Sequence, residues 1–393
     1  MIRTGRLFLS LLVLALLQWQ CKEKYVSPYV SPPTGYLVVE GFISGNGPTQ
    51  YMLSRTIGLP GTSGTPAELK AKVQVEGNDN SVFPLAEQGN GLYGADALAL
   101  QATVQYRLRI GTADGEQFLS DYVPYKPTPP IDSVNWVVNP DNSVQIYVNT
   151  HDPTNNTRYY LWNYRETWEN DAKETSLFVY DGDTIPVMVF RRDSSQQVDR
   201  CWVEDVSQQI LLSNSTKLAD DVIYRFPINN IPTNNEKDNV LYSTLVSQYA
   251  LTQQAYDYLT LMQKTTETLG SIFDAQPSAL KGNIRCLTNP GRPVVGYIFA
   301  GTVQQKRIFI YRSQIPSQFE RDCPAPDIVV ALAPDSLKKY FSPPSNAYSL
   351  NYTPILPHFN NQGHQDGWIA NATFCTNCTT YGGTTVKPSF WPN

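Results

Sequence analysis

The sequence predicts a mainly β protein: an N-terminal immunoglobulin-like β-sandwich, then a second, fibronectin-like β-sandwich region with an inserted helix and an irregular, disulfide-tied C-terminal tail. Composition is the first sign, since tyrosine (24), proline (29) and glycine (24) are plentiful among 393 residues and only 17% are charged. This composition is typical of sheets joined by many turns. The second sign is spacing, because strand-like runs of about five residues recur at intervals of roughly 8–12 residues.

Residues 1–20 are predicted to be a signal peptide. Two arginines precede the apolar run Leu7–Leu17, which has the charge and length of a secretory signal and is too short to span a bilayer. A signal peptide that ends at a cysteine is the bacterial lipoprotein arrangement, so we expect Cys21 to be the site of lipid attachment. Ordinary secretion is the alternative, although no A-x-A-like cleavage site lies nearby.

The tether and the first sandwich come next. Residues 21–35, rich in proline and serine, are predicted to be a lipid-anchored, extended tether. The β-sandwich of immunoglobulin-like size is predicted over residues 36–125. Its strand-like runs are Tyr36–Ile43, Gln50–Thr56, Lys72–Glu76, Ser81–Leu85, Gly91–Tyr93, Gln105–Ile110 and Gln117–Val123.

A proline-rich hinge leads into the second β-rich domain, predicted over residues 126–393. The helix is expected near 252–270, with Thr252 as N-cap, Gly270 as C-cap and an apolar face packed on a sheet. The tail over residues 313–393 is proline-rich, and we expect it to be irregular. The expected strands are Asp132–Val138, Ser143–Asn149, Arg158–Trp168, Ser176–Tyr180, Pro186–Phe190, Val222–Pro227, Val294–Ala300 and Lys306–Tyr311.

Cysteine use agrees with an exported protein. In an oxidising compartment the default state is the disulfide, and the odd number after Cys21 leaves at least one thiol free or paired with another chain. Redox activity and zinc binding are alternatives for the C-x-x-C of Cys375 and Cys378, but they lack a βαβ context and a second cysteine pair. We expect disulfides to tie the tail after Ser313. The five cysteines after Cys21 are Cys201, Cys286, Cys323, Cys375 and Cys378.

The remaining sequence excludes several classes of function. A net charge of −5 argues against nucleic acid as a partner, because nucleic-acid binding needs a basic stripe. No nucleophile elbow, phosphate loop or dinucleotide fingerprint occurs, and His151, His358 and His364 form no H-E-x-x-H. We therefore predict no catalytic residues, no metal and no cofactor, and we interpret His358, His364 and Asp366 as one solvated loop. A surface hydrolase whose paired carboxylates lie far apart in the chain stays an alternative.

One stretch has the composition of a binding surface. Tyr160, Trp162, Tyr164 and Trp168 alternate along a predicted strand, with Glu166 among them, so they share one face. Exposed aromatic rings on that face would suit sugars or planar ligands. The other interpretation is a sandwich core with tryptophan packed between the sheets.

Several short motifs are similar to those of one known family. Together they resemble the domain-of-unknown-function 4249 family of outer-membrane lipoproteins, typically encoded beside SusC-like TonB-dependent receptors. The resemblance spans nearly the whole chain, and the closing motif is its most specific part. Cys286 lies outside these motifs and is the candidate for the unpaired thiol, which leaves Cys201, Cys323, Cys375 and Cys378 as the disulfide candidates. The motifs are Leu37–Gly41, Ser54–Arg55, Cys201–Trp202, Ser271–Pro277, Gly282–Asn283, Gly296–Tyr297, Lys306–Ile310, Cys375–Cys378, Gly382–Thr384 and Lys387–Trp391.

The resemblance implies a location and a partner, and it supplies no chemistry. We expect a non-enzymatic protein that is lipid-anchored at the outer membrane and faces the cell surface. We expect it to serve a SusC-like TonB-dependent receptor by binding cargo or docking on the receptor, with much of the contact in the second half of the chain. A surface hydrolase acting on glycan or peptide, and a structural or assembly factor of the outer membrane, are the alternatives.

Overall fold

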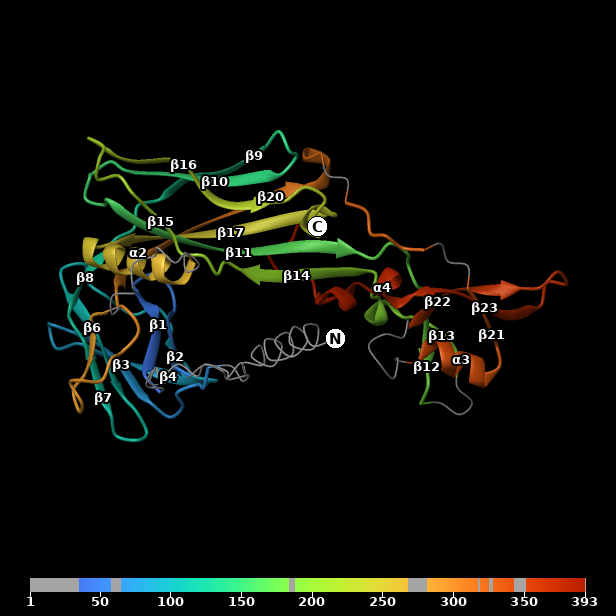
Figure 1. Ribbon diagram of the computed structural model, residues 1–393, viewed down its shortest axis with the longest axis horizontal. Helices are drawn as coiled ribbons and strands as arrows, with labels where there is room; N and C mark the ends of the chain where they lie inside the picture. The colour runs from blue at the N-terminus through green and yellow to red at the C-terminus, as the bar shows by residue number, and fades with distance from the viewer. Residues whose placement is uncertain are drawn as a thin grey trace, which may run out of the picture.

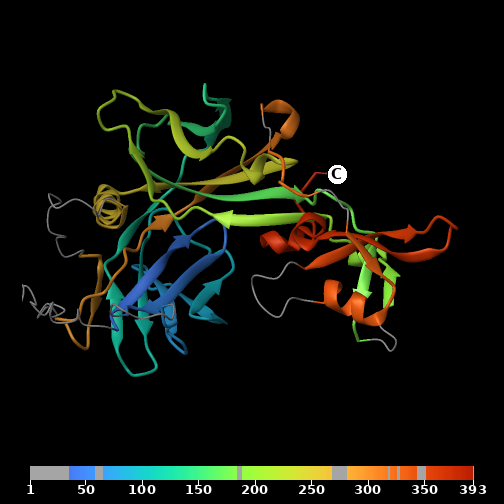
Figure 2. The same ribbon diagram turned by 45° about the vertical axis from the view of Figure 1, so that its right-hand side comes forward.

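The computed structural model describes residues 35–57, 65–183, 188–267, 281–316, 319–324, 328–342 and 351–392. The signal peptide, Cys21, the tether and the motif at 271–277 lie outside the described residues. No helix within the described ranges combines the length and apolar character needed to cross a membrane. A barrel lies below a two-sheet layer, and a separate C-terminal lobe extends to one side (Figures 1 and 2).

The N-terminal part is a closed barrel, so the prediction of an immunoglobulin-like sandwich is wrong there. Its eight strands follow one another around the ring as β6-β3-β4-β5-β2-β1-β19-β8, and β8 pairs back onto β6. Closure removes the exposed sheet edges that an open sandwich would leave. The strands are β1 (Leu37–Ser44), β2 (Thr49–Arg55), β3 (Lys72–Gly77), β4 (Val82–Gly89), β5 (Leu92–Ala95), β6 (Gln105–Gly111), β8 (Val123–Lys126) and β19 (Ala300–Gly301), with β7 (Gln117–Ser120) and β18 (Ile284–Cys286) extending from β6.

Two elements of the barrel come from the middle of the second predicted domain. β19 lies parallel between β1 and β8, with Ile43 opposite Ala300 and Ala300 opposite Tyr125. β18 pairs with β7. Their inward residues complete a core that also holds the fully buried rings of Tyr51, Tyr93 and Phe118. The barrel therefore needs segments that are far apart in the sequence.

Two sheets face each other in the second part of the chain. One has the order β16-β10-β9, and the other has the order β14-β11-β17-β20 with β15 also paired to β11. Residues of both sheets form one shared hydrophobic core. The strands are β9 (Ile131–Val138), β10 (Val144–Asp152), β11 (Tyr159–Asp171), β14 (Arg200–Val206), β15 (Leu211–Asn214), β16 (Asp221–Ile231), β17 (Leu241–Leu251) and β20 (Val303–Tyr311).

The predicted helix forms where the chain leaves this layer. α2 (Gln253–Glu267) begins after Thr252, whose hydroxyl accepts a hydrogen bond from the Ala255 N–H at 3.2 Å. Ala255 and Tyr258 are buried, and the Tyr258 hydroxyl accepts a hydrogen bond from the Gly296 N–H. After α2 the chain supplies β18 and β19 to the barrel and returns to the facing sheets as β20. The predicted end at Gly270 lies outside the described residues.

The tail is more regular than the sequence predicts. It forms the sheet β21-β23-β22, which packs through Trp368 on α3 and on a hairpin inserted between β11 and β14. This packing supplies the apolar surface that the tail lacks alone, which is why its segments become ordered strands. The elements are β12 (Phe178–Asp181), β13 (Met188–Arg191), β21 (Ile328–Ala331), α3 (Pro334–Phe341), β22 (Tyr352–Phe359), β23 (Gln365–Ala372) and α4 (Thr373–Thr376). Among the described residues, 3-10 turns lie at Ser194–Gln196, Glu236–Asp238, Arg312–Gln314 and Cys378–Tyr381.

Candidate functional site

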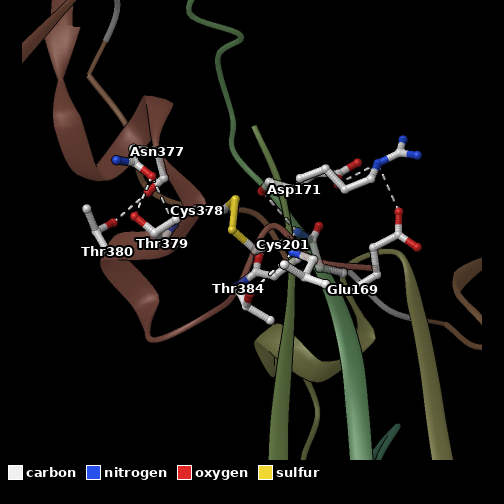
Figure 3. Close-up of a disulfide and its surroundings, with 12 residues drawn as sticks. Glu169, Asp171, Cys201, Asn377, Cys378, Thr379, Thr380 and Thr384 are labelled. Carbon is white, nitrogen blue, oxygen red and sulfur yellow. Dashed lines mark hydrogen bonds and ion pairs between the residues drawn. A yellow bond between two sulfur atoms is a disulfide. The ribbon is translucent and has the colours of Figure 1, made fainter. Parts of the chain in front are cut away.

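The four predicted disulfide cysteines pair in the structure. Cys201, on β14, joins Cys378 just after α4, and Cys323 joins Cys375. The two cysteines of the C-x-x-C motif therefore bind different partners, and the C-terminal segment is tied both to the facing sheets and to itself. Figure 3 shows the first of these bonds beside Thr384, whose backbone pairs with that of Trp202 in both directions. Cys286 is buried and has a free thiol.

The aromatic residues of β11 belong to the core and do not form an exposed binding face. Tyr160 and Trp162 have no exposed surface, Trp168 is 5% exposed, and Tyr164 packs against the same cluster. The Trp162 ring stacks on Tyr160 and on Phe226 of the opposite sheet. The even-numbered face of β11 points between the two sheets, so of the two interpretations the structure supports the packed core.

Glu166 lies on this buried face and is fully engaged by neighbouring groups. Its carboxylate forms an ion pair with Lys237 and accepts hydrogen bonds from the Tyr242 hydroxyl at 2.8 Å and the Asn229 amide at 3.0 Å. Burial raises the pKa of the Tyr242 hydroxyl well above its usual value, which keeps that group a hydrogen-bond donor. A carboxylate held in this way is a satisfied structural charge.

The histidines make local pairs. His151 contacts the Asp132 carboxylate at 2.8 Å, and His358 contacts Asp366 at 2.6 Å. His364 lies in the turn between β22 and β23, where its backbone N–H donates to the Asn360 side chain. Within the part of the chain that the structure describes, no three His, Cys, Asp or Glu side chains gather in a way that could hold a metal ion.

A cleft of about 860 Å³ lies between the barrel and the outer face of the larger sheet. One wall consists of residues from β1, β2 and the turn that joins them, together with Phe299. The opposite wall consists of residues from β11, β17 and β20, together with Val206 and Ser207. Its 19 lining residues include no aspartate, glutamate, histidine, cysteine or lysine. The polar lining is made of asparagine, glutamine, serine and tyrosine side chains and one arginine, Arg165.

The sheet side of the cleft is set by strand register. Leu161, Asn163 and Arg165 are the odd-numbered residues of β11, and they point away from the core that holds the even-numbered ones. Their neighbours on β17 are Tyr249, Ser247 and Leu245. Gln305 of β20 lies opposite Ser247. The cleft wall is therefore ordered in rows that cross the strands.

Hydrogen bonds connect the barrel to the larger sheet beside the cleft. The Asn46 side chain, in the β1–β2 turn, donates to the Val303 carbonyl at 2.8 Å and accepts from the Val303 N–H at 2.9 Å. The Thr128 N–H donates to the Thr302 hydroxyl at 2.8 Å, and the Ala250 N–H donates to the Thr128 hydroxyl. Because both walls are fixed through the same few residues, the cleft is preformed.

Sequence reasoning missed this wall of the cleft. A usable signal was present, since the residues that alternate with the buried aromatics of β11 are Leu161, Asn163 and Arg165. Assigning the aromatics to the core would have placed these three on the outer face. The contribution of Phe42 and Phe299 could not be predicted, because it depends on how the barrel closes.

More than half of the chain matches one family model. The model of a family described as Domain of unknown function (DUF4249) matches residues 23–307. The chain belongs to the DUF4249 family. Both walls of the cleft, the barrel strands and α2 lie within the matched residues, whereas the segment after 307 lies outside them. The closing motifs, Cys375–Cys378 and Lys387–Trp391, are therefore beyond the DUF4249 match. No curated protein matches the chain in sequence.

Proposed function

We propose that this DUF4249 protein is a lipid-anchored, cell-surface binding protein of the outer membrane that serves a SusC-like TonB-dependent transporter. One observation carries the binding role: a preformed cleft whose lining offers hydrogen-bonding amides, hydroxyls and aromatic rings. General acid–base chemistry uses mainly His, Asp, Glu, Lys, Tyr or Cys side chains. Of these types the lining contains tyrosine alone, and burial raises the pKa of both Tyr164 and Tyr249. The cleft is therefore better suited to holding a cargo than to hydrolysing it.

The start of the barrel supports attachment through an N-terminal tether. The Gly35 carbonyl accepts hydrogen bonds from Arg55 at 3.1 Å and from Arg292 at 2.8 Å. Both guanidinium groups pair with the largely buried carboxylate of Glu116. Arg55 comes from β2 and Arg292 from the segment after β18, so they fix the entering chain to two distant parts of the barrel. A tether attached at Gly35 would therefore join the barrel at a residue that Arg55 and Arg292 hold in place.

We propose in addition that the facing sheets are a fibronectin-like sandwich with two insertions. The order β16-β10-β9 opposite β14-β11-β17-β20 supports this assignment. The first insertion is the β12–β13 hairpin between β11 and β14. The second runs from α2 to β19 between β17 and β20.

The decisive experiment is affinity purification of the protein from solubilised outer membranes, with Cys21→Ala as the matched variant. The native protein should fractionate with the outer membrane, carry an acylated N-terminal cysteine by mass spectrometry, and co-purify with a TonB-dependent receptor. The Cys21→Ala variant should be absent from the membrane fraction and should no longer co-purify with the receptor, because the lipid raises the local concentration of the protein beside the receptor. An unmodified N-terminus elsewhere would contradict the anchor. Recovery without any receptor would favour the hydrolase or the assembly factor.

A further inference from the structure

The rows of the sheet wall change in chemical character along the cleft. The first row is Leu161, Tyr249 and Val303, which is apolar and aromatic. Phe42 and Phe299 of the barrel close over this row, with the Phe42 ring centroid 5.1 Å from both Tyr249 and Phe299. This end of the cleft offers a partly buried apolar surface with an aromatic cover.

The second row is neutral and polar. It consists of Asn163, Ser247 and Gln305. The Gln305 amide nitrogen donates to the Ser247 hydroxyl at 2.9 Å, and the Asn163 amide nitrogen lies 3.4 Å from the Tyr249 hydroxyl. Each contact uses one of the two N–H groups of its amide, so each amide keeps one N–H donor and its carbonyl acceptor. A row that offers both donors and acceptors suits a ligand with N–H and C=O groups along its length, such as a peptide backbone.

The third row contains two positively charged side chains, Arg165 and Arg307. Arg165 lies opposite Leu245, and Arg307 continues the row on β20. Arg307 is engaged, since its guanidinium stacks on Phe390 at 3.5 Å, donates to the Ser243 hydroxyl and lies in the field of Glu204. Arg165 is exposed and lines the cleft, and among the described residues no carboxylate lies within ion-pair distance of it. Its guanidinium can bind a carboxylate through two parallel hydrogen bonds.

We infer that the cleft binds the C-terminal end of a peptide, an inference that rests on the proposed cargo-binding function. Residues two apart on a strand are separated by about 6.6–6.8 Å, so the first and third rows lie about 13 Å apart. An extended peptide advances about 3.3–3.6 Å per residue, and four residues therefore span the rows. The terminal carboxylate pairs with Arg165, the backbone N–H groups face Asn163 and Gln305, and an apolar side chain three residues earlier enters the aromatic end. A neutral sugar chain would leave Arg165 without a partner.

The test is calorimetric titration of the full chain with two probes, acetyl-Phe-Gly-Gly-Ala and the same peptide with a C-terminal amide. The free acid should bind, and the amide should bind about tenfold more weakly, because a charge-assisted bidentate contact is lost. Arg165→Gln should weaken the acid by a similar factor and leave the amide unchanged. Arg285→Gln is the matched control, since Arg285 forms an exposed ion pair with Asp121 on the barrel and is not part of the cleft.

Other outcomes separate the ligand class from the proposed function. Equal binding of acid and amide, or acid binding that does not depend on Arg165, would overturn the peptide C-terminus as ligand. Binding of neutral maltotriose that is lost in Phe42→Ala, with no peptide binding, would overturn it too while preserving the cleft as a cargo site. If neither the peptides nor maltotriose bind but the receptor still co-purifies with the protein, the inference of a peptide ligand fails. The accessory role then survives as docking on the receptor.

Discussion

Glu76 holds together an ionic cluster on the outside of the barrel. Its carboxylate accepts hydrogen bonds from Arg107 at 2.7 Å, Arg109 at 2.5 Å and the Gln74 amide at 2.8 Å. The three donors come from β3 and its neighbour β6, so the cluster reinforces a pairing on which barrel closure depends. Burial alone would raise the pKa of Glu76, but hydrogen bonds from Arg109, Gln74 and Arg107 outweigh it and lower the pKa from 4.5 to about 2.

This depressed pKa predicts a defined acid sensitivity. A carboxylate whose pKa is lower in the folded than in the unfolded state stabilises the fold fully above its unfolded pKa. The contribution of Glu76 should therefore be complete above about pH 4.5 and be lost as the pH falls toward 2. We expect a loss on the order of 2 kcal/mol, allowing for the partial exposure of both arginines.

Urea unfolding at a series of pH values measures this loss. The difference in unfolding free energy between the native protein and Glu76→Gln should shrink across that window. Glu40→Gln is the control, because Glu40 is exposed on β1 and no described residue forms an ion pair with it. A Glu76→Gln difference that stays constant with pH would contradict the prediction.

At the scale of the element, β11 separates what sequence can predict from what it cannot. Period two placed Tyr160, Trp162, Tyr164 and Trp168 on one face, and the structure confirms that common face. Which face is buried depends on the sheet that packs against it, and β9, β10 and β16 are brought there by long-range pairing. Alternation alone therefore could not decide between core and binding surface.

The strands of the tail were missed for a related reason. Pro354 and Pro357 interrupt the period in β22, and proline normally argues against a strand. β22 lies at the edge of its sheet, where missing N–H donors can be tolerated. Tying of the tail by cysteines was predicted from composition, whereas the pairing partners could not be, since several connectivities fit the same sequence.

The two disulfides should contribute to the free energy of unfolding and to the protease resistance of the tail after Ser313. Cys201–Cys378 closes a sequence separation of 177 residues and Cys323–Cys375 one of 52. A cross-link that restricts the unfolded chain stabilises by about 2–4 kcal/mol. We expect Cys375→Ser and Cys378→Ser each to lower the free energy of unfolding by about that amount, and limited proteolysis to cut first after Ser313.

Cys286→Ala is the control for these variants, because it removes a buried thiol without removing a cross-link. Its tail should resist protease as well as the native tail does. A tail that stays equally resistant in Cys375→Ser and Cys378→Ser would show that packing around Trp368 and Trp391 suffices to hold it.

The segment between β17 and β20 joins the facing sheets to the barrel. Between β17 and β20 the chain forms α2, adds β18 and β19 to the barrel, and returns. Sequence reasoning divided the chain near residue 125 because composition changes at the proline-rich hinge. The strand predicted over Val294–Ala300 is shortened to β19 in the structure, and its assignment to the barrel could not be predicted, since its pairing with β1 and β8 is non-local. For the same reason, cutting the protein near residue 125 does not separate two complete halves.

Barrel closure therefore predicts the behaviour of fragments. Residues 36–126 alone lack β18 and β19, so β1 and β8 keep open edges and the core loses Ile284, Ile298 and Ala300. We expect this fragment to show no cooperative thermal transition by circular dichroism and little dispersion in amide NMR spectra. Joining it to residues 281–302 through a Gly/Ser linker of about 20 residues, which spans roughly 25 Å, supplies every barrel strand and should restore both signals. The matched control carries the same linker and scrambled residues 281–302. A cooperative transition in residues 36–126 alone would mean that the first seven strands of the ring already make a stable domain, and β19 would then serve only to join the barrel to the facing sheets.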